Sequence, residues 1–150
     1  MSSDKTFQVL MTYDKCHDVC TALLDSDISD FEKENSVVLP QELRCLYQHF
    51  DGGEIFIPGT TIFGLANSNK RKTIKEVNSK LSRSRFDIPS TYLIFAKLNF
   101  GDLICVNLNA PFDVIQWDHE NNEEYCVWSS ISEWIDETIR EYIDYEEGAN

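Results

Sequence analysis

Residues 39–53 constrain the fold more than any other segment, because they contain a complete helix together with its start and stop signals. Pro40 suits a first helical turn, where its missing N–H costs little. Apolar side chains then recur at i, i+3, i+4 and i+7, the spacing that buries one helix face: Leu43, Leu46, Tyr47 and Phe50. Gly52 and Gly53 follow, and glycine ends a helix because it adopts the left-handed conformation without a Cβ clash. The segment therefore predicts an amphipathic helix that packs on a core and then turns sharply.

Short apolar runs separated by turns follow this helix and predict strands. The runs are rich in β-branched and aromatic residues and lie at residues 55–57, 61–65, 92–96, 103–107 and 114–117. Neighbouring runs joined by short turns pair antiparallel, because parallel pairing needs a crossover of about a dozen residues or more. Only the interval 66–90 is long enough to hold such a crossover.

Helical patterns surround these strands. Helices are expected at residues 4–24 and 27–35, and at 70–85, where Ile74, Val77 and Leu81 supply an apolar face and basic residues the outer side. Ser130 and Glu133 form a capping-box pattern that starts a last helix, and its tail at 146–150 is expected to fray. The order favours an α+β fold in a single domain, residues 1–150, with a mainly antiparallel sheet of about five to six strands and helices packed around it.

Charge is distributed unevenly along the chain. The 150 residues hold 26 Asp+Glu and 13 Lys+Arg, a formal net charge of −13. Residues 113–150 contain 12 acidic residues and a single basic residue, Arg140. Residues 70–85 contain seven Lys+Arg and a single acidic residue, Glu76. The acidic excess argues against nonspecific binding to nucleic acid or to an anionic membrane, and it favours a basic partner. The alternative is an acidic surface that serves solubility.

Cysteine content and the first residues favour the cytoplasm. Five cysteines, an odd number without a Cys-x-x-Cys, are typical of reduced thiols packed in a core. Residues 1–5 lack the basic and apolar regions of a secretory signal, and no apolar run approaches the ~20 residues that span a bilayer. The alternative for Cys16 and Cys20 is a metal site that they would form with His17 and His49. A second closely spaced pair of ligands, as metal sites usually have, is missing from the sequence.

Motifs of catalysis and cofactor binding are missing from the sequence. It contains no phosphate-binding loop, no Gly-x-Gly-x-x-Gly, no His-Glu-x-x-His and no Gly-x-Ser-x-Gly elbow. Asp118, His119 and Glu120 suggest acid–base chemistry, but no nucleophile adjoins them and neighbouring residues need not face one site. We therefore expect no catalytic residue, no cofactor and no metal, and a protein that acts by binding.

Four segments together resemble one known family. The sequence LPQELRCLYQHFDGG at residues 39–53 resembles the signature "Leu-Pro, helix, Tyr, Asn/Asp-Gly-Gly" of the SUKH superfamily, also called the Smi/Knr family. TIFGL at 61–65, IPSTYLIFA at 88–96 with the Gly-Asp pair at 101–102, and VIQWDHE at 114–120 resemble its later strands in the same order. The resemblance covers residues 28–139. The chain departs from it at Asn107, where many relatives have Asp, and in an N-terminal helix without a matching motif.

The resemblance implies an α+β fold without catalysis. Bacterial members are mostly immunity proteins that bind and neutralise a cognate polymorphic toxin, often a nuclease or a deaminase. Fungal members instead act as interaction proteins, so a non-catalytic scaffold or regulatory protein is the alternative. We expect the immunity function, with a basic nuclease-type toxin domain as partner and with neither nucleic acid nor membrane bound. The oligomeric state stays open.

Acidic residues in the expected loops are the candidate partner contacts. Loops at one end of the sheet would present them together to a basic surface. They are Asp102, Asp118, Glu120, Glu123 and Glu124. The alternative for each is an ordinary solvated loop carboxylate.

Overall fold

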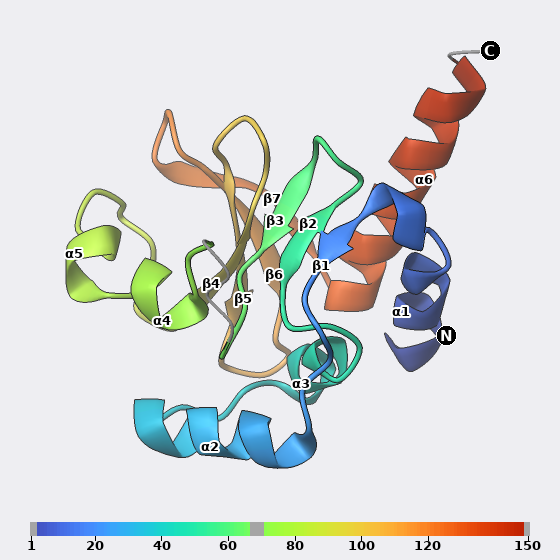
Figure 1. Cartoon of the computed structure of the whole chain (residues 1–150). Helices are drawn as coiled ribbons and strands as arrows, with labels where there is room; N and C mark the ends of the chain where they lie inside the picture. Colours follow the sequence, from blue (N-terminus) through green and yellow to red (C-terminus); the bar gives the residue numbers. More distant parts are fainter. Residues whose placement is uncertain (1–2, 67–70, 149–150) are drawn as a thin grey trace.

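A meander of antiparallel strands forms the centre of the computed structural model, which describes residues 3–66 and 71–148 (Figure 1). Within these ranges seven strands follow one another across the sheet in chain order. They are β1 (Asp18–Val19), β2 (Gly53–Ile55), β3 (Thr60–Ile62), β4 (Tyr92–Lys97), β5 (Leu103–Asn107), β6 (Val114–Asp118) and β7 (Glu123–Trp128). The α+β class and the antiparallel pairing are confirmed, and the number of strands exceeds the expectation because β1 and β7 were not foreseen.

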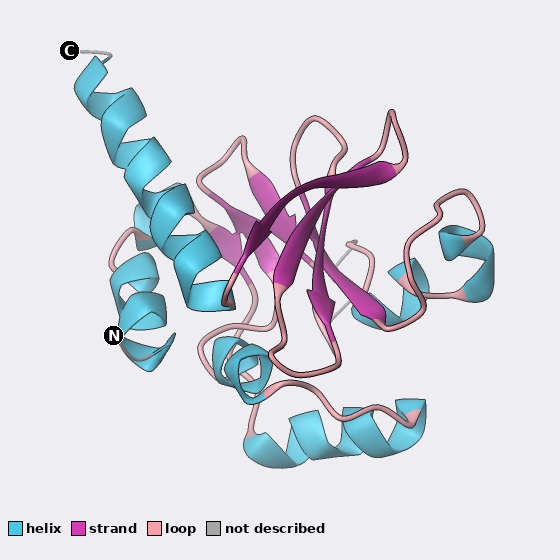
Figure 2. Ribbon diagram, turned by 180° about the vertical axis from the view of Figure 1, so that it is seen from behind, coloured by secondary structure: helices cyan, strands magenta, loops and turns pink. Residues whose placement is uncertain are grey.

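Helices cover both sides of this sheet. They are α1 (Ser3–Met11), α2 (Asp25–Asn35), α3 (Gln41–Tyr47), α4 (Ile74–Val77), α5 (Lys80–Arg83) and α6 (Ile131–Gly148), with a 3-10 turn at Asp14–Cys16. α1, α3 and α6 contact one another on one side, and α4 and α5 lie on the other, where α4 contacts β4 (Figures 1 and 2). Every helix in the described ranges is too short or too polar to cross a bilayer.

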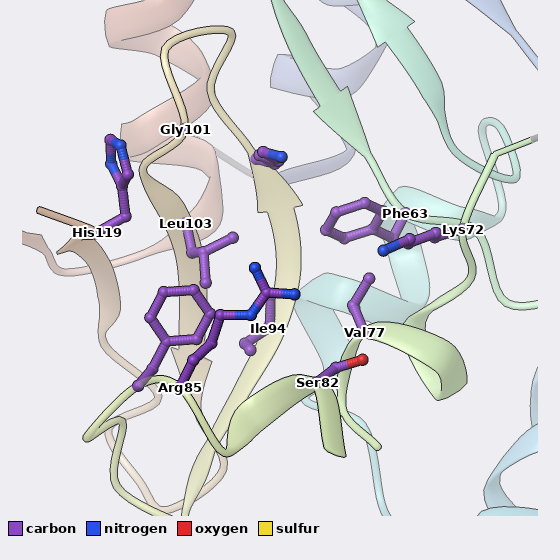
Figure 3. A pocket seen from close by; sticks show the side chains of 11 residues that line it. Phe63, Lys72, Val77, Ser82, Arg85, Ile94, Gly101, Leu103 and His119 are labelled. Carbon is purple, nitrogen blue, oxygen red and sulfur yellow. The ribbon is translucent and has the colours of Figure 1, made fainter. Parts of the chain in front are cut away.

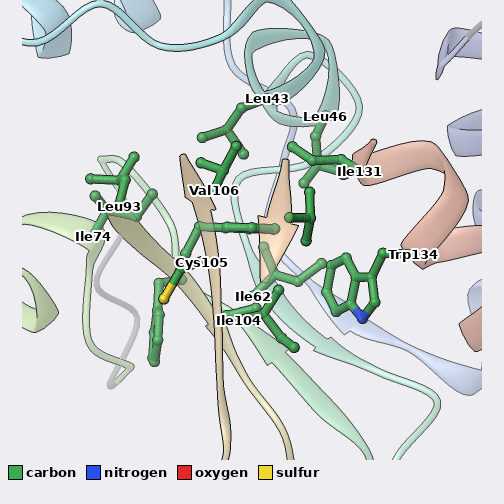
Figure 4. Close-up of a cluster of buried hydrophobic side chains, with 14 of the residues drawn as sticks. Leu43, Leu46, Ile62, Ile74, Leu93, Ile104, Cys105, Val106, Ile131 and Trp134 are labelled. Atoms are coloured by element: carbon green, nitrogen blue, oxygen red, sulfur yellow. The ribbon is translucent and has the colours of Figure 1, made fainter. Parts of the chain in front are cut away.

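The expected helix after Pro40 is confirmed as α3. Its apolar stripe is fully buried, as is Phe50 just beyond its end. Figure 4 shows Leu46, Ile131 and Trp134 gathered beside Ile62 of β3, so α3 and α6 share one core with the sheet. The chain then turns at Gly52, where φ is +75° and a Cβ would lie 2.6 Å from the Ile62 carbonyl oxygen.

The helix expected over residues 4–24 is wrong beyond Met11. The chain leaves α1, passes through the 3-10 turn and forms β1, in which Val19 pairs with Gly53 of β2. A Cβ on Gly53 would lie 2.5 Å from the Val19 Cα, so this pairing depends on glycine. Val19 therefore belongs to a strand at the sheet edge and not to a helix. Sequence periodicity did not reveal this strand, because its pairing partner Gly53 lies more than thirty residues away in the chain.

The continuous helix expected over residues 70–85 is also wrong. The side chains of Thr73 and Ser79 cap two separate short helices, α4 and α5. Between them Asn78 bonds the backbone of Ile94 in β4, accepting its N–H at 2.9 Å and donating to its carbonyl at 2.8 Å. This docking interrupts the helix and leaves Leu81 84% exposed instead of on a buried face. Lys70 lies outside the described residues.

The last helix begins as the capping box predicts. Ser130 Oγ accepts the Glu133 amide at 3.0 Å. Glu42 of α3 adds a second cap, because its carboxylate accepts the amides of Ile131 and Ser132, the latter at 3.2 Å. The helix includes residues 146–148 of the tail expected to fray, and residues 149–150 lie outside the described ranges.

Candidate partner-binding surface

Three turns meet at the end of the sheet away from α2 and α3 (Figures 1 and 2). They are residues 56–59 between β2 and β3, 98–102 between β4 and β5, and 119–122 between β6 and β7. With the adjoining strand ends Asp118 and Glu123, we call them the turn surface. Asn99 Nδ2 lies 3.5 Å from the Pro58 carbonyl oxygen, which joins the first two turns. The third joins through His119, which packs on Gly101. Of the acidic residues expected in loops at one sheet end, Asp102 and Glu120 lie in these turns, and Asp118 and Glu123 lie at the adjoining strand ends.

Asp102 holds two of these turns together. It is only 5% exposed, and its Oδ2 accepts a hydrogen bond from Gln116 Nε2 at 2.8 Å. Its Oδ1 accepts the His119 amide at 3.1 Å and lies 2.6 Å from His119 Nδ1, which must donate because a carboxylate only accepts. Gly101 adopts φ +111°, and a Cβ there would lie 2.7 Å from His119 Nε2. Asp102 therefore positions the hairpin and has little surface left for a partner.

Asp118 shapes the tip of the β6–β7 hairpin. Its Oδ1 accepts the amides of Glu120 at 2.9 Å and Asn121 at 3.1 Å, and its Oδ2 accepts Asn121 Nδ2 at 2.9 Å. These hydrogen bonds, with the Asn121 side chain foremost, lower the pKa of Asp118 below its usual value. The residue keeps a negative charge at the tip and fixes the direction in which the next side chain points.

The side chains of the three candidate glutamates, Glu120, Glu123 and Glu124, differ in their position in the hairpin and in their hydrogen bonds. The Glu120 side chain is 80% exposed. Glu123 and Glu124 do not lie in a loop as expected, because both belong to β7, opposite Asp118 and Trp117. Glu124 is exposed but accepts a hydrogen bond from the Tyr92 hydroxyl, which raises the Tyr92 pKa to about 12. Glu120 and Glu123 therefore present the more accessible charge.

A second hydrogen-bond set anchors the hairpin on its other side. Trp117 Nε1 donates to Asn122 Oδ1 at 3.0 Å, and Asn122 Nδ2 donates to Asp87 Oδ2 at 2.9 Å. The Asp87 amide also donates to Asn122 Oδ1, at 2.9 Å. The acidic tip is thus fixed before any partner arrives, which reduces the entropy lost on binding.

Sequence reasoning missed three apolar side chains on or beside the turn surface. Phe100 is 62% exposed, Ile57 52% and Tyr125 69%. Tyr125 has no partner on β6, because the register shifts between Gln116 and Trp117. Exposed aromatics inside a charged rim are typical of protein-binding hot spots. The available signal was a phenylalanine at residue 100, whose neighbours Asn99, Gly101 and Asp102 are polar or glycine.

Comparison with known sequence families matches residues 22–137, more than half of the chain, to the SMI1 / KNR4 family (SUKH-1). The chain belongs to this family. SUKH-1 is known for immunity proteins and is generally non-catalytic. No curated protein matches the chain. The family expected from four sequence segments is therefore confirmed, together with its α+β fold.

In this SUKH-1 chain the motif residues support the fold. Asp51 is 1% exposed, and its Oδ1 accepts the Leu65 amide at 2.7 Å, which ties the end of α3 to the segment after β3. Trp117 is 5% exposed and packs in the core. Asp51 and Trp117 are thus buried supports of the fold, whereas the motif residues Asp102, His119 and Glu120 belong to the turn surface.

Two groups in the described part of this SUKH-1 protein have metal-ligand atoms within 4.8 Å of one another: Asp102, Asp118 and His119, and Asp4, Cys45 and His49. Direct hydrogen bonds already join members of each, such as the 2.8 Å contact between His49 Nε2 and Asp4 Oδ1. The metal site weighed from sequence is not assembled, because His17 instead lies 3.0 Å from the Leu10 carbonyl oxygen and accepts the Phe56 amide.

Proposed function

We propose that this protein is an immunity protein that neutralises a cognate toxin by stoichiometric binding through the turn surface. The observation that carries the proposal is the exposed Phe100 beside the anchored acidic hairpin. Phe100 would enter an apolar recess of the toxin, and Glu120 and Glu123 would meet its basic residues. Membership of SUKH-1 supports this function, since the family is known for immunity proteins.

A nuclease is the class of toxin that fits this surface best. Domains that hold nucleic acid carry basic surfaces, because phosphate contacts supply much of their affinity. A protein with net charge −13 would be steered toward such a surface and would compete with the nucleic acid there. We expect this encounter to take place in the cytoplasm.

Co-expression with the toxin encoded beside its gene tests the proposal. The wild-type chain should restore growth of poisoned cells and form a one-to-one complex with the toxin. Phe100→Ala should weaken the complex, and so should the double variant Glu120→Lys/Glu123→Lys. Asp30→Lys/Glu34→Lys changes the net charge equally at exposed positions of α2 and serves as the control.

The control should protect as well as wild type. Equal loss of protection in both double variants would mean that only total charge matters. Full protection by Phe100→Ala and by the hairpin double variant would remove the turn surface from the proposal.

A further inference from the structure

A pocket of about 360 Å³ lies between the α4–α5 segment and strands β4 and β5 (Figure 3). Its floor is apolar and is formed by the side chains of Phe63, Val77, Phe86, Ile94 and Leu103. Two of these side chains, those of Phe63 and Phe86, are aromatic rings. Its rim carries three exposed cations, Lys72, Arg85 and Lys97. Figure 3 shows the Arg85 guanidinium reaching over Ile94 and Lys72 beside Phe63. The arrangement joins a hydrophobic floor to a positive rim.

The charge at this rim is unusual for the molecule. The chain has twice as many acidic as basic residues, yet in residues 3–66 and 71–148 no ion pair engages the three rim cations. Two arginines elsewhere are paired: Arg44 bonds Asp25 and Glu32, and Arg71 lies 2.7 Å from Asp18. The exposed Lys75 and Lys80 also lack an ion pair within the described ranges, so the rim is distinguished by three cations that share one opening. Like charges around one opening repel, so an anion bound among them would be stabilised.

Arg83 shows that cationic character in this segment is not by itself a binding feature. Its guanidinium donates to the carbonyl of Tyr92 at 2.7 Å and to that of Pro89 at 2.8 Å. Those bonds hold the segment against β4 and use the donors that a ligand would need. The rim residues Arg85 and Lys97 have no comparable bonds within the described ranges.

We propose that this pocket binds a small aromatic anion. The flat ring would lie on the floor near Phe63 and Phe86, where offset or edge contacts between rings are favourable. The phosphate or carboxylate would meet Arg85, Lys97 and Lys72 in charge-assisted hydrogen bonds. The volume suits a small molecule, since ligand pockets begin at roughly 300 Å³. A polymer such as RNA fits poorly, because its further phosphates would face a protein of charge −13.

Titration of the full chain with phenyl phosphate and with benzoate, followed by amide NMR, tests the pocket and separates the two anionic groups. One of them should bind saturably, with shifts at the amides of Ile94 and Leu103. Inorganic phosphate and phenol, which carry the two halves of the ligand, should each bind more weakly. Added salt should weaken binding because it screens the rim.

Three variants make the test specific. Arg85→Ala and Lys97→Ala should each weaken binding by about tenfold, the effect of losing one hydrogen bond to a charged group. Lys80→Ala removes the same charge from an exposed position in α5 that does not line the pocket, and it should bind as wild type. Absence of saturable binding by both probes would overturn the proposal, as would equal weakening in all three variants. Unchanged amide spectra in the free variants establish that each has folded.

Discussion

The Oδ1 atom of Asp102 lies 2.6 Å from Nδ1 of His119 and joins the β4–β5 turn to the β6–β7 hairpin. The sequence marks Asp102 as a candidate partner contact, but the structure makes it a support for Glu120 and Phe100, the residues that we propose make the contact. The acidic tip with Glu120 and the exposed Phe100 keep a fixed relation because this bond connects their turns.

Replacing Asp102 should destabilise the fold. Asp102→Ala removes the acceptor of Gln116 and of both His119 donors, and buried donors left without an acceptor cost about 1–3 kcal/mol. Urea denaturation should show a free energy of unfolding lower by that amount. Asp30→Ala, at an exposed position of α2, is the control and should be neutral. An unchanged midpoint for Asp102→Ala would contradict the supporting role.

Gly101→Ala should disturb the same junction from the other side. At φ +111° an L side chain is strained, and the new Cβ would push against the His119 ring. We expect a loss of about 1–3 kcal/mol, the usual cost of such backbone strain, and a displaced His119 ring resonance. Gly148→Ala is the matched control, since a Cβ there meets nothing within 4 Å. Equal thermal unfolding of both variants would count against this prediction.

Acid should loosen the tip of the hairpin. The pKa of Asp118 is lowered by hydrogen bonds that favour its charged form. Its contribution is therefore complete above the ordinary Asp pKa and is lost as the pH falls through the lowered value. NMR order parameters of the Glu120 and Asn121 amides should drop in that range. Asp118→Asn keeps an acceptor oxygen but does not titrate, so its amides should show no such step; a step in both proteins would point to another group.

Alkaline titration should reveal the bond between Tyr92 and Glu124. The Tyr92 pKa is raised to about 12, first by this hydrogen bond and then by burial. The protonated phenol thus contributes fully below the ordinary Tyr pKa, and the contribution disappears as the pH rises through about 12. Glu124→Gln should lower the Tyr92 pKa, followed by its ring resonances. Glu123→Gln should leave it unchanged, and an identical titration in both variants would exclude the bond as the cause.

Much of the fold was predictable because local signals agree with the tertiary structure. The stripe of α3 and the apolar runs of β4, β5 and β6 carry their own periodicity, and short turns dictate antiparallel pairing. β7 escaped prediction because its first three residues, Glu123, Glu124 and Tyr125, are all exposed at a sheet edge. The break between α4 and α5 also escaped, since it depends on Asn78 docking against Ile94.

The site was less predictable than the fold. Acidic residues at neighbouring turns could be placed at one end of the sheet, because turns of a meander alternate between its two ends. Nothing local distinguishes the buried Asp102 from the exposed Glu120, since the difference arises from His119 and Gln116 across the sheet. Phe100 was overlooked because an aromatic residue is usually assigned to the core.

The rate of association with the toxin that we propose as its partner tests the central claim most directly. Stopped-flow measurements at rising ionic strength should show a steep fall for the wild-type chain, because screening removes the electrostatic steering. At low salt, Glu120→Lys/Glu123→Lys should associate about tenfold or more slowly, within the range that steering supplies. Asp30→Lys/Glu34→Lys should associate faster than the hairpin variant. An association rate that is indifferent both to salt and to charge reversal at the hairpin would contradict the account.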